Sequence, residues 1–495
     1  MKRNWIFLLF PFLVIRGSAA EKQTIWTLNE CIDRALKTGY AVVNASSQYR
    51  ASRSNYEAAK RRLRTSVAAS LDLPNYQEAL SNQFDPLSQQ YKYFNLTTTR
   101  MQGSLSISQP ILFTGGTLTV SDYVFGRDQT SGGSSARAGK DYFNNFLVEF
   151  RQPLFTTNQL RLGDERSRLS FEQAQADFAK NQLDIVYAVT ESFYTTYQAV
   201  ERYSIVKEQV RQNEESYQTA KRKFEFGLIP EVEALQSEVD LAGSQNDLLN
   251  ASRDVERTKN QLKLLLGLSL GDQMEPSAVL EYTPLTIDSA RAIETALTSR
   301  AEIQSALRSV QQRELDIDAA RSRNEFRMDI SATYGYNKSA LVADDLLGQY
   351  GRTRSAALTV TLPLFDWGAH SYDVQAAQIQ FDNALAAQDY VQDQIRQEIL
   401  DLLGRINAAD SRIRVLQKNV AVAQKGYDIS LERFRTGTIG RNDLAQAQQR
   451  LTTTKLNSLS AQIEYKLGIA DLKRKTLFDF ERGRPVTPVI DGEQE

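Results

Sequence analysis

The chain has 495 residues, and its 59 Lys and Arg nearly balance its 60 Asp and Glu, which leaves a formal net charge of −1. Such a balance, without a basic block, excludes a chain that recruits nucleic acid through its charge. One Cys and one His exclude an internal disulfide and a metal site built from several thiolate or imidazole ligands.

Residues 1–20 have the pattern of a secretory signal. Lys2 and Arg3 precede an apolar stretch over residues 5–15, and Ser18-Ala19-Ala20 forms a small-residue cleavage site. No other apolar run reaches the roughly 20 residues that a membrane-spanning helix needs. An exported protein with this sequence must therefore use strands if it enters a membrane.

The rest of the chain contains two copies of one structural unit. From Pro153-Leu154-Phe155 onward the sequence realigns without a gap onto Pro363-Leu364-Phe365, displaced by 210 residues. The fronts of the two copies align at a larger displacement of 261 residues. Since 261 minus 210 is 51, the first copy contains 51 extra residues, and they lie between about residues 69 and 153. The predicted organisation is a first repeat over residues 21–267, a linker over 268–285, a second repeat over 286–478 and a polar C-terminal tail over 479–495.

Each repeat begins with a helical pattern and then changes to a period of two, which is typical of strands. The main alternating stretches, of up to about ten residues, suit tilted membrane-barrel strands. The predicted strands are residues 67–73 and 144–152 in the first repeat and 327–336 and 356–362 in the second. Alternation alone does not fix whether Tyr334 and Tyr336 or their neighbours, such as Thr333, face lipid.

The 51 extra residues contain two further alternating stretches, 101–108 and 117–125, joined by a predicted tight turn at Phe113-Thr114-Gly115-Gly116. They form either an extra hairpin of the barrel or an extended surface loop with local strand character. Polar or Gly-rich composition predicts loops over residues 75–99, 126–140 and 337–349.

A very long helix follows each Pro-Leu-Phe sequence. Over some sixty residues that include Phe171 and Phe224, apolar residues keep spacings of three, four and seven without an internal Pro or Gly. At 1.5 Å per residue this predicts a rod about 90 Å long. The predicted tip over residues 224–233 then turns the chain into a return helix that ends near Gly267, and the tip over residues 434–443 repeats this in the second copy.

Helix pattern alone is compatible with an exported coiled-coil spacer of the cell envelope that forms no channel. The strands favour a barrel, because a coiled coil gains nothing from a short amphipathic hairpin at the same place in each repeat. Two or three hairpins cannot close a barrel, since small barrels take about eight strands. Several chains must then share it.

No residue pattern supports an enzyme. The chain has neither a Gly-x-Ser-x-Gly elbow nor a Gly-rich phosphate loop, so we expect no catalytic residue, no cofactor and no metal. Cys31 is interpreted as a small buried hydrophobe rather than a lipid-attachment site, because Leu28-Asn29-Glu30 before it lacks the small residue that lipid attachment requires. His370 is interpreted as a surface residue.

The doubled order of signal, helix, hairpin, long helix, glycine turn and return helix resembles the TolC-like outer-membrane efflux protein family, also called outer membrane factors. The sequence Asp366-Trp367-Gly368 after the second Pro-Leu-Phe is typical of that family, whereas Thr156-Thr157-Asn158 in the first copy departs from it. The stretches Phe224-x-x-Gly227-Leu228 and Phe434-x-x-Gly437-Thr438 resemble its two helical tips.

The resemblance implies a mainly α-helical protein with a membrane β part, assembled as a homotrimer whose β-barrel in the outer membrane continues as an α-helical barrel through the periplasm. It implies a passive exit duct of a tripartite efflux or type I secretion system, with outer-membrane lipid around it. A periplasmic adaptor protein and an inner-membrane transporter would be its partners. Neither the transported substrate nor the transporter class follows from the sequence.

The resemblance also implies functional residues. The periplasmic aperture would involve Asp443, Glu233, Gln446 and Phe434, the adaptor would contact the tip residues Gly227, Leu228, Gly437 and Thr438, and the strand-to-helix transitions would lie at Pro153, Phe155, Pro363, Phe365 and Gly368. The family often has a second acid in place of Gln446 and a hydrogen-bonding tyrosine in place of Phe434. Alternatively, Glu233 and Asp443 are helix-start acids that stabilise the helix dipole.

Overall fold

The computed structural model describes residues 25–85, 88–131, 138–278, 280 and 282–486. The predicted secretory signal lies outside the described residues, as do residues 487–495 of the predicted tail and residues 132–137 of the predicted loop 126–140.

Helices make up most of the described chain. They are α1 (Leu28–Thr38), α2 (Tyr40–Arg62), α3 (Gln159–Glu225), α4 (Glu231–Leu266), α5 (Ser289–Ser299), α6 (Ala301–Arg321), η1 (Ser322–Asn324), η2 (Ala343–Leu347), α7 (Ala369–Arg435) and α8 (Arg441–Thr476). The strands are β1 (Ile25–Trp26), β2 (Ser66–Asp85), β3 (Gln90–Ile111), β4 (Gly116–Ser131), β5 (Ala138–Leu154), β6 (Glu275–Pro276), β7 (Arg327–Ala340), β8 (Gly351–Thr361), β9 (Phe478–Asp479) and β10 (Arg484–Pro485).

The two longest helices, α3 and α7, have 67 residues each, and the return helices α4 and α8 have 36 residues each. Every bound of α7 and α8 lies 210 residues after the matching bound of α3 and α4. The displacement found in the sequence therefore extends to the helix ends themselves. At 1.5 Å per residue each long helix measures about 100 Å.

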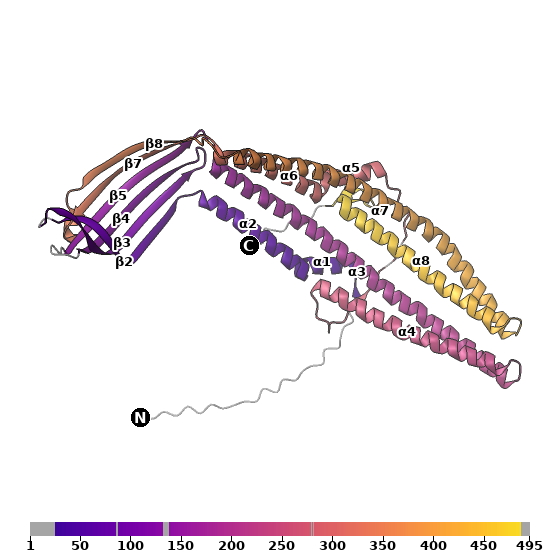
Figure 1. Ribbon diagram of the computed structural model, residues 1–495. Coiled ribbons are helices and arrows are strands. Elements are labelled where there is room, and N and C mark those ends of the chain that lie inside the picture. The colour runs from indigo at the N-terminus through magenta and orange to yellow at the C-terminus, as the bar shows by residue number, and fades with distance from the viewer. Residues whose placement is uncertain (1–24, 86–87, 132–137, 279, 281, 487–495) are drawn as a thin grey trace, which may run out of the picture. The chain divides into compact units, whose positions relative to one another are not determined.

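One antiparallel sheet contains six strands in the order β2-β3-β4-β5-β7-β8 (Figure 1). Two neighbours of this sheet, β3 and β4, come from the extra residues of the first repeat, and the turn between them places Gly115 at a φ of +75°. The extra residues thus form a hairpin within the sheet, and the alternative of a surface loop is wrong.

The strands are longer than the sequence pattern predicted. Residues 75–99, expected to form a loop, mostly belong to β2 and β3, and β7 continues to Ala340 inside the expected loop 337–349. The loop prediction failed because one face of this sheet is built from Ser, Thr, Asn and Gln, which resemble loop composition. A register irregularity lies between Asp72 and Asn75 of β2.

The register separates an apolar face from a polar face. Val67, Ile107, Val120, Val148 and Tyr334 form one apolar row from β2 to β7, and this row ends at Arg354 in β8. The adjacent row consists of Ser66, Ser108, Thr119, Glu149, Thr333 and Ser355, and these side chains lie on the opposite face. Tyr334 and Tyr336 therefore share the apolar face, and Thr333 lies on the polar one.

The described chain divides into two compact units. One combines the residues up to Ala45 with Asn181–Ala296 and those from Glu398 onward, and the other combines Ser46–Lys180 with Leu297–Gln397, which includes the six-stranded sheet. In the first unit, Cys31 and Ala35 of α1 pack with Val189 and Phe193 of α3. Cys31 is fully buried, as expected, and burial raises its pKa to about 12.

None of the described helices has the length and hydropathy of a membrane span. Within the described residues, no group of His, Cys, Asp and Glu side chains has the arrangement of a metal site. His370 is half-buried near the start of α7, where its backbone N–H donates to Asp366 Oδ2 at 2.9 Å.

Candidate functional site

Two turns end the long helices, and they have the same hydrogen-bond pattern. At the end of α3, Gly227 N–H donates to Phe224 O and Leu228 N–H donates to Lys223 O, each at 2.8 Å. Gly437 and Thr438 repeat both bonds at the end of α7, at 3.1 and 2.8 Å. This pair of bonds is the Schellman motif, which requires a left-handed residue, and both glycines supply it with φ of +70° and +77°.

The return helices begin with acidic residues. Glu231 and Glu233 lie in the first turn of α4 after Pro230, and Asp443 lies in the first turn of α8. Neither helix has a side-chain N-cap hydrogen bond, and these carboxylates lie in the first turn, where the positive end of the helix favours negative charge. Asp443 is exposed, whereas Glu233 is half-buried.

A small core joins the two turns within the first compact unit. Phe434 is 2% exposed and packs with Tyr427 of α7, Leu444 and Leu451 of α8 and Ala220 of α3. The Phe434 side chain therefore packs the turn and is not exposed to solvent. Gln446, two residues beyond Leu444, is exposed.

Charged and polar side chains also link the α3–α4 pair to the α7–α8 pair. Lys223 donates to the backbone carbonyl of Phe434, and its ammonium lies 4.4 Å from the centre of that ring. Burial lowers the pKa of Lys223, while the nearby Glu233 carboxylate acts to raise it.

Two ion pairs and one amide contact add to this link. Arg435 pairs with Glu215, Arg441 pairs with Asp240, and Gln448 Nε2 donates to Gln209 O at 3.2 Å. No sequence pattern predicted these contacts. The partners lie more than 200 residues apart and belong to no short motif, so only the matching of the two tips by the 210-residue displacement could have suggested that they meet.

The predicted strand-to-helix transitions lie in the second compact unit. Pro153 is the last residue but one of β5, where it lies opposite Asp329 of β7. The exposed Phe155 follows the strand with a φ of +56°. Pro363 and the exposed Phe365 lie between β8 and α7, and Gly368 has a φ of +81°.

Each transition is fixed by a different capping side chain. Asp366 Oδ1 accepts from Gly368 N–H at 3.0 Å, and the backbone N–H groups of His370 and then Gly368 lower the pKa of this carboxyl. In the first copy, Asn158 Oδ1 accepts from the N–H groups of Leu160 and Arg161 at 3.1 Å. The first copy departs from the family pattern at Thr156-Thr157-Asn158, but its helix is still capped, because Asn158 does what Asp366 does in the second copy.

The family model described as outer membrane efflux protein matches residues 122–268 and 292–474, which is more than half of the chain. The chain belongs to the outer membrane efflux protein family. The resemblance drawn from the sequence is confirmed.

Named relatives agree with this assignment. The outer membrane efflux protein BepC of Brucella suis is 21% identical over 345 residues, covering 68% of this chain and 74% of BepC. The probable efflux pump outer membrane protein TtgC of Pseudomonas putida is 23% identical over 302 residues, covering 60% of this chain and 61% of TtgC.

Solved structures share the fold. The outer membrane channel CmeC of Campylobacter jejuni matches with a TM-score of 0.69 and 18% identity, over 91% of this chain and 85% of CmeC. CusC matches with a TM-score of 0.68 and 15% identity, over 91% of both chains. This efflux protein is therefore an outer-membrane transport protein, and its family does not consist of enzymes, as the sequence predicted.

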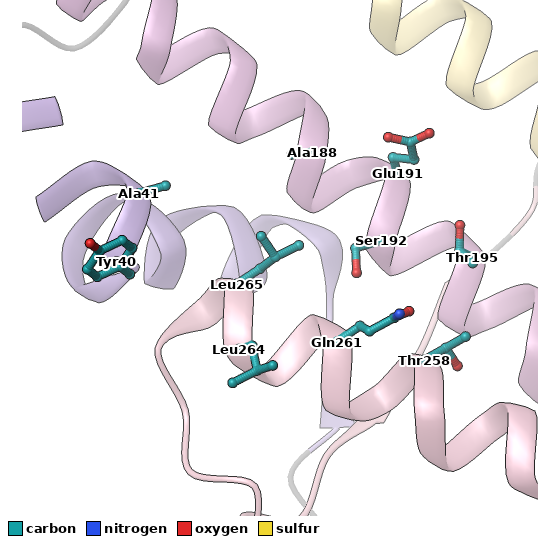
Figure 2. Close-up of a pocket in the computed structure, with 10 residues that line it drawn as sticks. All are labelled: Tyr40, Ala41, Ala188, Glu191, Ser192, Thr195, Thr258, Gln261, Leu264 and Leu265. Carbon is teal, nitrogen blue, oxygen red and sulfur yellow. The ribbon is translucent and has the colours of Figure 1, made fainter. Parts of the chain in front are cut away.

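The efflux protein has a surface hollow of about 540 Å³ in its first compact unit (Figure 2). It is lined by Tyr40 and Ala41 of α2, by Ala188, Glu191, Ser192 and Thr195 of α3, and by Thr258, Gln261, Leu264 and Leu265 of α4. Glu191 is the one carboxylate in this lining. The hollow is a groove between helices α2, α3 and α4.

Proposed function

We propose that three copies of this efflux protein form a passive exit duct, in which a shared β-barrel crosses the outer membrane and a shared helical barrel extends through the periplasm. The duct opens and closes at the paired helical turns. An inner-membrane transporter supplies the energy and a periplasmic adaptor joins it to the duct, in a tripartite efflux or type I secretion system.

The observation that carries the proposal is a pair of uncovered apolar stripes on the helices. Val415, Val422 and Ile429 of α7 are separated by seven residues each and are more than half exposed. On α4, the exposed residues are Val232, Leu235, Val239 and Leu249. Seven-residue spacing is typical of a coiled-coil seam, and such a seam needs a partner helix. Because the chain leaves both stripes exposed, neighbouring copies are the partners that cover them.

The sheet supports the membrane part of the proposal. Val67, Leu71 and Leu358 on its apolar face are each about three-fifths exposed or more. Lipid would cover this face, while the Ser- and Thr-rich face would line a water-filled lumen. A coiled-coil spacer without a channel has no use for an exposed apolar sheet.

The gate would be a ring of three Asp443 carboxylates, one from each copy. Asp443 and Gln446 are exposed and are free to line a lumen, whereas Glu233 lies close to the Lys223 ammonium. A ring of carboxylates favours cations and narrows the pore electrostatically. The intramolecular pairs Arg441–Asp240 and Arg435–Glu215 would hold the tips in one arrangement.

The adaptor would bind the two turns, which differ in chemistry. The first turn exposes Phe226 and Leu228, and the second has the hydroxyls of Thr436 and Thr438 3.0 Å apart. Around the trimer, apolar and polar turns would alternate, so the adaptor would contact two chemically different kinds of turn.

Single-channel recording of the purified protein in a planar bilayer, combined with its mass in detergent, tests the proposal. We expect a heat-modifiable trimer that fractionates with the outer membrane and conducts ions. A monomer that remains in the periplasmic wash and gives no conductance would instead favour the spacer.

A further inference from the structure

The six-stranded sheet is open at both edges. Among the described strands, β2 pairs with β3 alone and β8 pairs with β7 alone. Each edge strand therefore presents a row of backbone N–H and C=O groups without ladder partners, and lipid does not tolerate such an edge. Six strands are also too few for a barrel of one chain, since small barrels take about eight.

We propose that the β8 edge of one copy pairs with the β2 edge of the next in a defined register, so that three copies close a barrel of eighteen strands, six from each. The inference rests on the trimer of the proposed function. It adds which edges meet, how they align, and how wide the resulting lumen is.

The direction of the strands permits this pairing. Successive strands of the sheet are antiparallel, so with six of them β2 and β8 run in opposite directions. β2 begins shortly after α2 and β8 ends shortly before α7, so both have their helix-side ends on the same side of the membrane. The next copy therefore continues the antiparallel order.

The internal register sets the alignment. The row that starts at Ser66, the first residue of β2, reaches Ser355 in β8, six residues before the strand ends at Thr361. If the helix-side ends align, Thr361 lies opposite Ser66 of the next copy and Ser355 lies opposite Asp72. A row of paired residues that enters one copy at Ser66 therefore enters the next copy at Asp72, six residues further along β2.

This displacement suits a closed barrel. Three displacements of six residues give a total shear of about eighteen for eighteen strands, and equal shear and strand number correspond to a strand tilt of about 36°. Membrane barrels have tilts of about 35–45°.

The alignment also keeps both faces continuous. Thr359 comes opposite Ala68 on the polar face, and Val360 comes opposite Val67 on the apolar face. A slip of one residue would place Thr359 beside Val67 and mix the two faces. Pro74 lies at the register irregularity of β2 and lacks an N–H, so the ladder between copies ends near Asp72.

The hairpin of β3 and β4 therefore widens the duct. Without it each copy would supply four strands, and because barrel diameter grows roughly in proportion to strand number, eighteen strands give a lumen about one and a half times as wide as twelve. Barrels of 16–18 strands hold an aqueous channel. The extra residues of the first repeat would thus admit bulkier solutes.

Disulfide trapping tests the register in the full-length protein. Cys31, the one native cysteine, is fully buried and does not interfere. We expect the double variant Thr359→Cys with Ala68→Cys to form covalent trimers on oxidation, while each single variant gives none. A second pair, Ala357→Cys with Ser70→Cys, should give the same result, so misfolding of one variant leaves the test intact.

A third cysteine pair distinguishes a failure of the eighteen-strand barrel from a failure of the proposed trimer. If β2 and β3 stay outside a twelve-strand barrel, β4 becomes the edge that meets β8, and Thr359→Cys should cross-link to Thr119→Cys instead. That result overturns the eighteen-strand barrel but leaves the trimer. Trimers by mass with no cross-link in any pair would also overturn it. Monomers by mass would overturn the proposed function itself.

Discussion

The ammonium of Lys223 lies 4.4 Å from the centre of the Phe434 ring, and it donates a hydrogen bond to the backbone carbonyl of the same residue. A cation thus sits at the C-terminal end of α7, where the helix dipole is negative and carbonyls lack helical partners. Since Lys223 belongs to the last turn of α3, this contact joins the ends of the two long helices.

Replacing this lysine should loosen the second turn. Lys223→Met keeps much of the aliphatic stem but removes the cation and its hydrogen bond, and we expect a loss of about 1 kcal/mol in local stability. Hydrogen exchange of the amides around Gly437 measures it. Lys221→Met, on the exposed side of the same helix, is the matched control and should leave these amides unchanged.

The glycines of the turns should respond differently from glycines inside the helices. Gly227→Ala and Gly437→Ala place a Cβ at a φ near +70°, which costs about 1–2 kcal/mol. Gly243 lies in the middle of α4 with open space around it, so Gly243→Ala should stabilise the helix by about 0.5–1 kcal/mol.

Limited proteolysis at the tips provides the measurement for the glycine variants. Faster cleavage in both turn variants and unchanged or slower cleavage in Gly243→Ala is the expected result. Equal behaviour of all three would show that backbone conformation does not hold the turns.

Much of this architecture could be predicted from the sequence because repetition preserves register. The displacement that matches Gly227 with Gly437 also matches the ends of all four long helices. The strands were underestimated because residues such as Ser104 and Ser106 form a polar sheet face, and a polar strand resembles a loop when its partners are unknown.

The contacts between the tips could not be predicted in this way. Lys223, Arg435 and Arg441 look like ordinary charged residues at helix ends, and their partners are set by how two helical pairs pack. The burial of Phe434 in the packing of this tip could not be predicted either. Side-chain placement within a turn depends on neighbours that a repeat alignment does not reveal.

The pair Arg441–Asp240 should bias the duct toward its closed arrangement. Asp240 is partly exposed, so the coupling free energy should be small, about 0.2–1 kcal/mol. Arg441→Ala and Asp240→Ala should each raise the open probability in bilayer recordings by up to several-fold, and the double variant should add little.

Charge reversal provides the control for this pair. Asp240→Arg combined with Arg441→Asp should restore part of the closed population, since the opposite charges again face each other. An additive effect of the two alanine variants would mean that the residues act independently.

Asp443 should control the passage of cations through the tips. Asp443→Ala removes three carboxylates from the proposed ring, so we expect a higher conductance or the loss of block by multivalent cations. Glu238→Ala, an exposed acid on α4, is the control for a general change in surface charge. Unchanged current and block in Asp443→Ala would leave this residue with the role of a helix-start acid.

The two faces of β7 offer the sharpest test of the membrane part. Tyr334 lies in the apolar row with Val148, and Thr333 lies in the polar row with Glu149. Tyr334→Lys would place a charge against lipid and should impair insertion by about 2–4 kcal/mol if the position lies near the bilayer midplane. Thr333→Lys would face the lumen, so it should be tolerated.

The amount of heat-modifiable trimer in the outer-membrane fraction measures the effect of both β7 variants, and the same variants in a detergent-refolded sample show whether lipid is the cause. Equal tolerance of the two lysines would mean that the apolar face of this sheet does not meet lipid, whereas loss of Thr333→Lys alone would place lipid on the polar face.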